Sequence, residues 1–560
     1  MKRRSFAMIM AALIASASAM PSMAAAEDYL SGITLQGDEW LVMSSEQSRD
    51  GVHSMLALQP GGVGIGETRG DWISCTGIDD PTCSNPVAKK TILAWALLTD
   101  CTITDQEFCI ESLKLSVGGQ VLEEAKLIGS GDPRNNFEGN PKQNLLPGNS
   151  VPIYSTQTAL NEAGNGNFAV MIRPSQFWDS AKGSFVTGDL EAAILPYFLN
   201  GEEGSGACLF TVGGVCARST DFLAGTKIEL TFRIPKSLGG WFSGRMKDPT
   251  ISIAPLSAQA NRIQITSEPV EVAALGLVKS KAAFTDVENM WQQNNGKWFA
   301  NGGWATGANS WQPNIFPFIE NYRPQVNDTA IGTNLVWKMR TIGSGGGSNC
   351  LADKSRVLGI VTTNALGYDI GSPEFRDGFL EYKVAGLHYM PNGKDLVIGT
   401  YDLIIESETA RCLYGFTNAP VSATVTVVGT GDQNVASTVV SEKDGWLKLA
   451  AYGFTFSEKE IKVKLSQPLT KSLSEFSGSS KTLSAKQKNE VSALMKKVSS
   501  NPKFICTGTY VKPSDKAIAL SRAKAVCNYA KGLDKNHSFF AQAKQTKAAS
   551  YDGKVMVSSK

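Results

Sequence analysis

One cysteine spacing occurs three times in the first half of this 560-residue chain and limits how that half can fold. Cys75–Cys83, Cys101–Cys109 and Cys208–Cys216 each enclose seven residues. Two further pairs, Cys350–Cys412 and Cys506–Cys527, bring the total to ten cysteines, an even number with none left over. Paired cysteines are typical of oxidising compartments, so we expect five disulfides between these nearest neighbours in an exported protein.

Metal binding is the alternative use of these cysteines, and the sequence disfavours it. The spacings lack C-x-x-C character, and the chain has only three histidines, His53, His388 and His537, which are widely separated. A zinc site or a histidine-based catalytic triad is therefore not expected, and we predict no metal, no cofactor and no enzymatic activity. Paired carboxylates for glycoside hydrolysis stay open, because they require proximity in space and not in sequence.

The N-terminus has the three parts of a signal peptide. Lys2, Arg3 and Arg4 are basic, residues 6–20 are apolar, and small residues at 24–26 fit a cleavage site before Glu27. A membrane anchor is the alternative, but the apolar run is shorter than the roughly 20 residues that span a bilayer. We therefore predict a signal peptide over 1–26, a mature chain without a transmembrane segment, and an extracellular or cell-surface location.

Charge is divided unevenly along the chain. Residues 458–560 contain 19 Lys and one Arg against seven acidic residues, whereas residues 27–457 contain 31 Lys and Arg against 45 acidic residues. A basic tail on an acidic body can bind an anionic polymer such as a wall glycan, although a lysine-covered, solubilising surface would have the same composition. Nucleic acid is not an expected partner, because no binding motif for it is present.

The body of the chain has the pattern of β-structure. Residues 226–234 alternate polar and apolar side chains as a half-buried strand does, and further alternating segments follow turns. We predict a disulfide-pinned β-rich domain over 27–280 and a second β-sandwich-like or jelly-roll-like domain over 331–470, in which 444–449 and 461–465 form a closing strand pair. The fold class is thus multidomain and mainly β, with a small C-terminal α/β domain.

Residues 281–330 differ in composition from both β-rich units. Trp298, Trp304 and Trp311 lie among Asn, Gln and Gly, together with other aromatic residues. Aromatic rings can stack on sugar faces while amides bind hydroxyl groups, so these three indoles are a candidate sugar platform. The same composition suits a loop-rich segment whose rings fill a β-core, and we favour that second interpretation.

The C-terminal part reads as a small basic α/β domain over 483–560, after a linker over 471–482. Residues 483–498 are helix-periodic, 503–509 read as a strand, and 554–557 read as a last strand. Ser514 or Asp515 can cap a second helix that runs to about Lys531.

The start of that second helix resembles the signature of the OmpA-like peptidoglycan-binding domain. The signature L-S-x-x-R-A-x-x-V stands here as residues 518–526, with Arg522 at the arginine position. The resemblance implies a β-α-β-α-β domain in which Arg522 and an aspartate hold the carboxylate and amine ends of a cell-wall diamino acid. Val511 occupies the position of that aspartate, and Asp515 is a candidate substitute. Cys506 and Cys527 would join the strand to the helix.

Two functional hypotheses follow from these patterns. The first is a secreted, non-enzymatic cell-envelope protein with a structural or adhesive role, attached non-covalently to peptidoglycan or an anionic glycan through its basic C-terminal domain. The second is a secreted carbohydrate-binding or carbohydrate-active protein that binds an extracellular glycan through the aromatic segment 291–322.

Overall fold

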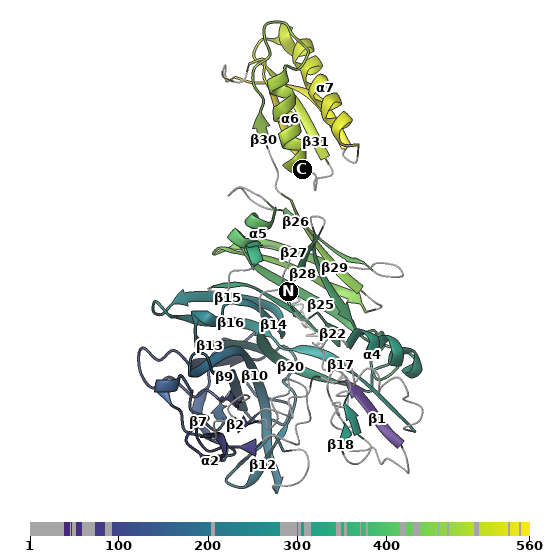
Figure 1. Ribbon diagram of the computed structural model, residues 1–560. Coiled ribbons are helices and arrows are strands. Elements are labelled where there is room, and N and C mark those ends of the chain that lie inside the picture. Colours follow the sequence, from purple (N-terminus) through teal and green to yellow (C-terminus); the bar gives the residue numbers. More distant parts are fainter. Residues whose placement is uncertain are drawn as a thin grey trace, which may run out of the picture.

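The computed structural model shows a large β-rich body and a small α/β domain that stands clear of it (Figure 1). Within the described residues, no helix is long and apolar enough to cross a membrane. The described residues are 39–44, 46, 52–58, 73–84, 92–202, 208–280, 299–300, 304–306, 315–342, 349–351, 356–369, 371–376, 379–414, 422–428, 437–456, 459–466, 470–497, 503–535, 538–547, 550 and 552–559. The predicted signal peptide therefore lies outside them.

Nineteen strands of the body are connected by pairing into one extended sheet system. Its strands are β1 (Glu39–Ser44), β2 (Met55–Leu58), β3 (Ile73–Ser74), β4 (Ile92–Trp95), β7 (Lys126–Ser130), β8 (Pro152–Ser155), β9 (Asn167–Asp179), β10 (Ser184–Glu202), β11 (Phe210–Val212), β12 (Val215–Ser219), β14 (Gly240–Arg245), β17 (Val270–Ser280), β18 (Phe299–Ala300), β19 (Trp304–Thr306), β20 (Gly332–Ile342), β21 (Val357–Thr363), β25 (Ile398–Glu406), β27 (Ser437–Lys443) and β28 (Trp446–Thr455). The mainly β character predicted from the sequence is confirmed.

Two five-stranded sheets complete the body. The first has the order β15-β16-β13-β5-β6, and the second has β22-β24-β29-β26 with β23 beside β24. Their bounds are β5 (Cys109–Ser116), β6 (Glu123–Glu124), β13 (Lys227–Pro235), β15 (Lys247–Pro255), β16 (Ala260–Glu268), β22 (Gly367–Tyr368), β23 (Glu374–Arg376), β24 (Phe379–Ala385), β26 (Ser422–Val428) and β29 (Lys459–Ser466). In β13 the predicted alternation places Ile228, Leu230, Phe232 and Ile234 in the core.

Strand β20 joins the two β-rich units that the sequence predicted over 27–280 and 331–470. It pairs antiparallel with β10, β14 and β17 of the first unit. Trp337 of β20 and Ile360 of β21 pack in one buried cluster with Phe232 and Phe242. The two predicted units therefore share one sheet system and one core.

The predicted closing pair 444–449 and 461–465 is wrong. Strand β28, which begins at Trp446, pairs with β25 and β27 in the large sheet system. Strand β29 pairs with β24 and β26 in a five-stranded sheet. Alternation predicts each strand correctly, but it does not encode which partner the strand selects.

All five predicted disulfides are present, and no described cysteine is free. Cys208–Cys216 crosses the β11–β12 hairpin, as expected for a loop-pinning bond. Cys350–Cys412 joins the short 3₁₀ helix η7 (Asn349–Leu351) to α5 (Ser407–Tyr414). The other short helices in the described part of the body are α2 (Pro81–Ser84), η3 (Pro141–Gln143), η4 (Lys236–Leu238), α4 (Ile315–Tyr322) and η6 (Arg323–Val326).

The C-terminal domain is a four-stranded sheet covered by two helices (Figure 1). In chain order its elements are β30 (Thr470–Ser472), α6 (Ala485–Lys497), β31 (Lys503–Tyr510), η8 (Pro513–Asp515), α7 (Lys516–Leu533), β32 (Ser538–Gln545) and β33 (Val555–Ser559). The sheet order is β30-β33-β31-β32, with β31 and β32 parallel across α7. Val491, Leu494 and Met495 of α6 are buried, as the helical periodicity predicted.

Helix α7 packs very close to β31. A Cβ atom added at Gly508 of β31 would lie 1.9 Å from the backbone oxygen of Ala519 on α7. Only glycine fits this approach without backbone movement. Cys506–Cys527 joins the same strand and helix, as predicted. The position of α7, and with it that of Arg522, is thus set by close packing and by a covalent bond.

Candidate functional site

Arg522 is almost completely buried, and its guanidinium holds two loops of the C-terminal domain together. Its side chain is 5% exposed. Nε donates to the backbone oxygen of Ser480 (2.9 Å), Nη1 donates to that of Gly553 (2.9 Å), and Nη2 donates to that of Gly478. The guanidinium also lies over the ring of Phe476, with 5.0 Å from Cζ to the ring centroid.

The guanidinium lines a cavity of about 400 Å³ at the N-terminal end of α7. Asp515 lines the same cavity, so the structure brings together both residues that the sequence predicted for ligand binding. Three of the five guanidinium N–H groups donate to the backbone oxygens above. The remaining two N–H groups have no hydrogen bond to a described residue.

Asp552 is a site residue that the sequence reasoning missed. It lines the cavity, and its Oδ1 accepts a hydrogen bond from the backbone N–H of Val511 (2.9 Å). A carboxylate from the loop before β33 therefore lies beside Val511 at the end of β31. The Asp552–Gly553 pair is a turn signal before the last strand, and Gly553 has a positive φ of 68°.

The cavity has more negative than positive charge. Glu475 also lines it, and Lys554 lies 3.2 Å from the carboxylate of Glu475. Burial lowers the pKa of Arg522, and the nearby carboxylates of Asp552 and Asp515 oppose that shift. Arginine stays charged under all ordinary conditions. The cavity therefore presents one buried cation and several carboxylates around it.

The predicted sugar platform is not placed by the structure. Trp298 and Trp311 lie outside the described residues, and for Trp304 only the backbone of β19 is described. Two other aromatic residues of this segment, Phe318 and Tyr322 on α4, are 1% exposed and belong to the core. For these two residues the core interpretation is confirmed.

Groups of His, Cys, Asp and Glu that could hold a metal ion are absent from the described part of the chain. Comparison of the sequence with protein-family models and with curated proteins returned no match.

Proposed function

We propose that this chain is an exported, non-enzymatic cell-envelope protein whose C-terminal domain attaches it non-covalently to the cell wall. The observation that carries the proposal is the cavity in which Arg522, Asp515 and Asp552 meet. These residues lie on and around the segment 518–526 that resembles the OmpA-like signature. In chain order the domain has β30, α6, β31, α7, β32 and β33, which is one strand more than the β-α-β-α-β order that the resemblance implies.

The charges of the cavity suit a ligand that carries both signs. A guanidinium with unused N–H groups binds a carboxylate through paired hydrogen bonds. The carboxylates of Asp515 and Asp552 attract an ammonium group beside it. The free carboxylate and amine of a cell-wall diamino acid have this combination. The OmpA-like family has an aspartate where this chain has Val511. We propose that Asp552 supplies that carboxylate instead.

The lysines of this region add a second, weaker attraction. Residues 458–560 carry 19 Lys and one Arg against seven acidic residues. Such a surface attracts any polyanion, including an anionic wall glycan, and salt screens that attraction over about 10 Å at 0.1 M ionic strength. Salt dependence therefore separates the specific site from general attraction.

Co-sedimentation of the full chain with insoluble peptidoglycan tests this function. We expect the wild-type protein to sediment at low salt and to remain largely bound at high salt, because the cavity interaction is partly buried. Asp515→Asn removes a cavity carboxylate at the N-terminal end of α7, and Asp534→Asn makes the same change at the other end of that helix. The first variant should lose its salt-resistant binding and the second should keep it. If the wild type and both variants all lost peptidoglycan binding at high salt, the proposal would be contradicted.

A further inference from the structure

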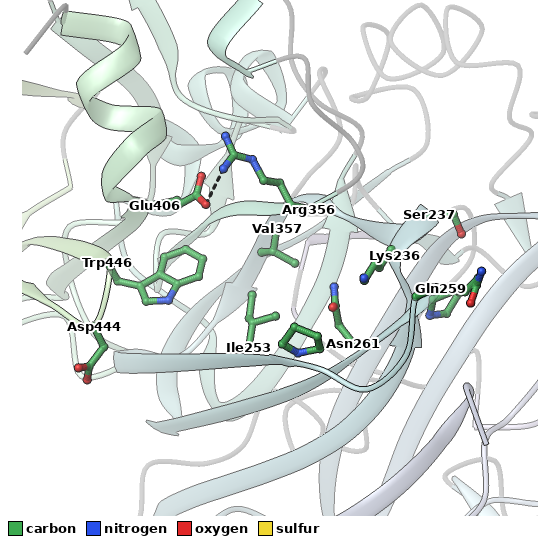
Figure 2. Close-up of a pocket in the computed structure, with 14 residues that line it drawn as sticks. Lys236, Ser237, Ile253, Gln259, Asn261, Arg356, Val357, Glu406, Asp444 and Trp446 are labelled. Carbon is green, nitrogen blue, oxygen red and sulfur yellow. Dashed lines mark hydrogen bonds and ion pairs between the residues drawn. The ribbon is translucent and has the colours of Figure 1, made fainter. Parts of the chain in front are cut away.

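A second pocket, of about 850 Å³, lies in the β-rich body, where the sheet containing β13, β15 and β16 meets the large sheet system (Figure 2). Backbone hydrogen bonds tie its walls together. The N–H of Lys236 donates to Gln259 O (2.6 Å), that of Gly240 donates to Arg356 O (2.6 Å), and that of Ser407 donates to Gly445 O (2.8 Å). The pocket is therefore built from fixed segments, which favours binding because little ordering is required.

One wall of the pocket is apolar. Trp446 begins β28 directly after a two-residue turn in which Asp444 and Gly445 have φ values of 52° and 81°, as in a type I′ hairpin. This tight turn fixes the position of the indole. Figure 2 shows the ring turned toward the interior of the pocket, with Val357 and Ile253 beyond it. The indole of Trp446 is half-buried, and the apolar wall that it forms with Val357 and Ile253 is large enough to pack against one face of a ligand.

Asn261 contributes an amide to the opposite side. The residue is 7% exposed, and Figure 2 shows its amide directed into the pocket. Among the residues that the structure describes, this side chain has no hydrogen-bond partner. The amide can therefore both donate to and accept from a molecule in the pocket. Gln259 adds an exposed amide to the same pocket.

The charged residues of the pocket cancel. Arg356 Nη1 lies 2.8 Å from Glu406 Oε1 and 3.3 Å from Glu408 Oε2. The remaining charged lining residues are Lys236 and Asp444, one of each sign. The pocket therefore has no net formal charge with which to select an anion or a cation.

We propose that this pocket binds a neutral oligosaccharide. Sugar rings would pack their C–H faces against Trp446 and the aliphatic wall, and hydroxyl groups would exchange hydrogen bonds with Asn261 and Gln259. An amide and a hydroxyl each donate and accept, so the two groups complement one another without charge. The volume lies within the roughly 300–1,000 Å³ of small-molecule sites. The site is independent of the proposed attachment to the wall.

Calorimetric titration of the full chain tests the inference. The probes are neutral hexasaccharides of β-linked glucose, β-linked N-acetylglucosamine and mannose, with a proline-rich peptide as the competing occupant. We expect saturable binding of at least one hexasaccharide with a Kd of about 1 mM or tighter. Trp446→Ala should weaken that binding at least about tenfold, which corresponds to about 1.4 kcal/mol, and Trp446→Phe should weaken it less.

Glutamine variants keep the test decisive if Trp446→Ala fails to fold. Gln259 and Gln120 are both exposed, but only Gln259 lines the pocket. Gln259→Ala should weaken the same binding several-fold, whereas Gln120→Ala and the wall-site variant Asp515→Asn should leave it unchanged. Absence of binding to all three hexasaccharides, binding of the proline-rich peptide alone, or sugar binding that Gln259→Ala does not alter would overturn the inference.

Discussion

Two buried arginines, Arg245 in the β-rich body and Arg522 in the C-terminal domain, have similar hydrogen-bond partners. They differ in whether a carboxylate forms an ion pair with the guanidinium. Each donates hydrogen bonds to three backbone oxygens, which for Arg245 are those of Thr363, Ala365 and Leu366. Each also lies over an aromatic ring, with Tyr368 at 4.4 Å from Arg245 Cζ and Phe476 at 5.0 Å from Arg522 Cζ. Both side chains therefore hold separate parts of the chain together.

The difference lies in the carboxylates. Glu46 is 2.7 Å from Arg245 Nη2 and 2.7 Å from Lys338 Nζ, and its side chain is 1% exposed. Arg522 forms no ion pair with any described residue and instead lines a cavity with Asp515 and Asp552. Removing one partner of a buried ion pair destabilises the fold because it leaves a buried charge unmatched, whereas a charged side chain that lines a cavity with perturbed neighbours is a candidate for ligand binding. We therefore expect a structural role for the first arginine, and we propose that the second also binds a ligand.

The largest expected effect comes from breaking the closed cluster. Glu46→Gln leaves the buried Arg245 and the half-buried Lys338 without their carboxylate, so the free energy of unfolding should fall by about 3–5 kcal/mol in urea denaturation. Burial raises the pKa of Glu46, but Arg245 and Lys338 lower it more, to about 2. Its stabilising contribution is therefore present above about pH 4.5 and is lost as the pH falls toward 2.

Glu124→Gln is the matched control, because Glu124 is exposed on β6. It should leave the free energy of unfolding unchanged. Equal stability of the wild type and Glu46→Gln would show that the cluster around Arg245 is not structural and would remove one side of the comparison.

A second buried carboxylate of the body, Asp402, should affect the pH dependence of stability in the opposite direction. Asp402 accepts hydrogen bonds from Tyr452 Oη (2.5 Å) and from the N–H of Asp248 (3.2 Å), while Lys448 Nζ lies 3.8 Å away. Burial raises the pKa of Asp402 to about 6. The folded state thus binds a proton more tightly than the unfolded state, and stability should fall as the pH rises from about 4 to about 6.

Asp402→Asn should remove this pH dependence and raise the free energy of unfolding above pH 6 by up to about 3 kcal/mol. Urea midpoints at pH 4 and pH 7 measure both effects, with the exposed Asp444→Asn as control. Destabilisation by Asp402→Asn at pH 7 would mean that its contact with Lys448 stabilises the fold more than its burial opposes it.

A smaller effect should follow from altering the clamp of Arg522. Arg522→Lys keeps the charge but cannot reach all three backbone oxygens, so the C-terminal domain should lose about 1–3 kcal/mol. Amide hydrogen exchange over 470–559 measures this loss separately from the body. Arg134→Lys, at an exposed position of the body, should change nothing. Unchanged exchange in Arg522→Lys would contradict the clamp.

Much of this organisation is predictable from local sequence. Pairing of nearest-neighbour cysteines predicted the disulfides, alternation predicted β13, and helical periodicity predicted α6. The insertion of β20 among β10, β14 and β17 was not predictable, because a strand's own residues do not specify distant partners.

The residues of the C-terminal cavity and of the pocket at Trp446 also differ in how far local sequence could predict them. Arg522 and Asp515 are seven positions apart, and the local motif 518–526 contains Arg522. Asp552 reaches Val511 from 41 residues away, through the loop between β32 and β33. The pocket at Trp446 combines segments near 236, 259, 356, 406 and 446. Only the tertiary fold brings such segments together.

The most direct test of the binding role of Arg522 is calorimetric titration of the full chain with a soluble wall stem peptide whose diamino acid has a free carboxylate and a free amine. The account predicts saturable binding that Asp552→Asn weakens at least about tenfold and Asp534→Asn leaves intact, with both variants as stable as the wild type. Absence of binding, or equal binding by Asp552→Asn and the wild type, would contradict the account and place Arg522 with Arg245 as a structural residue.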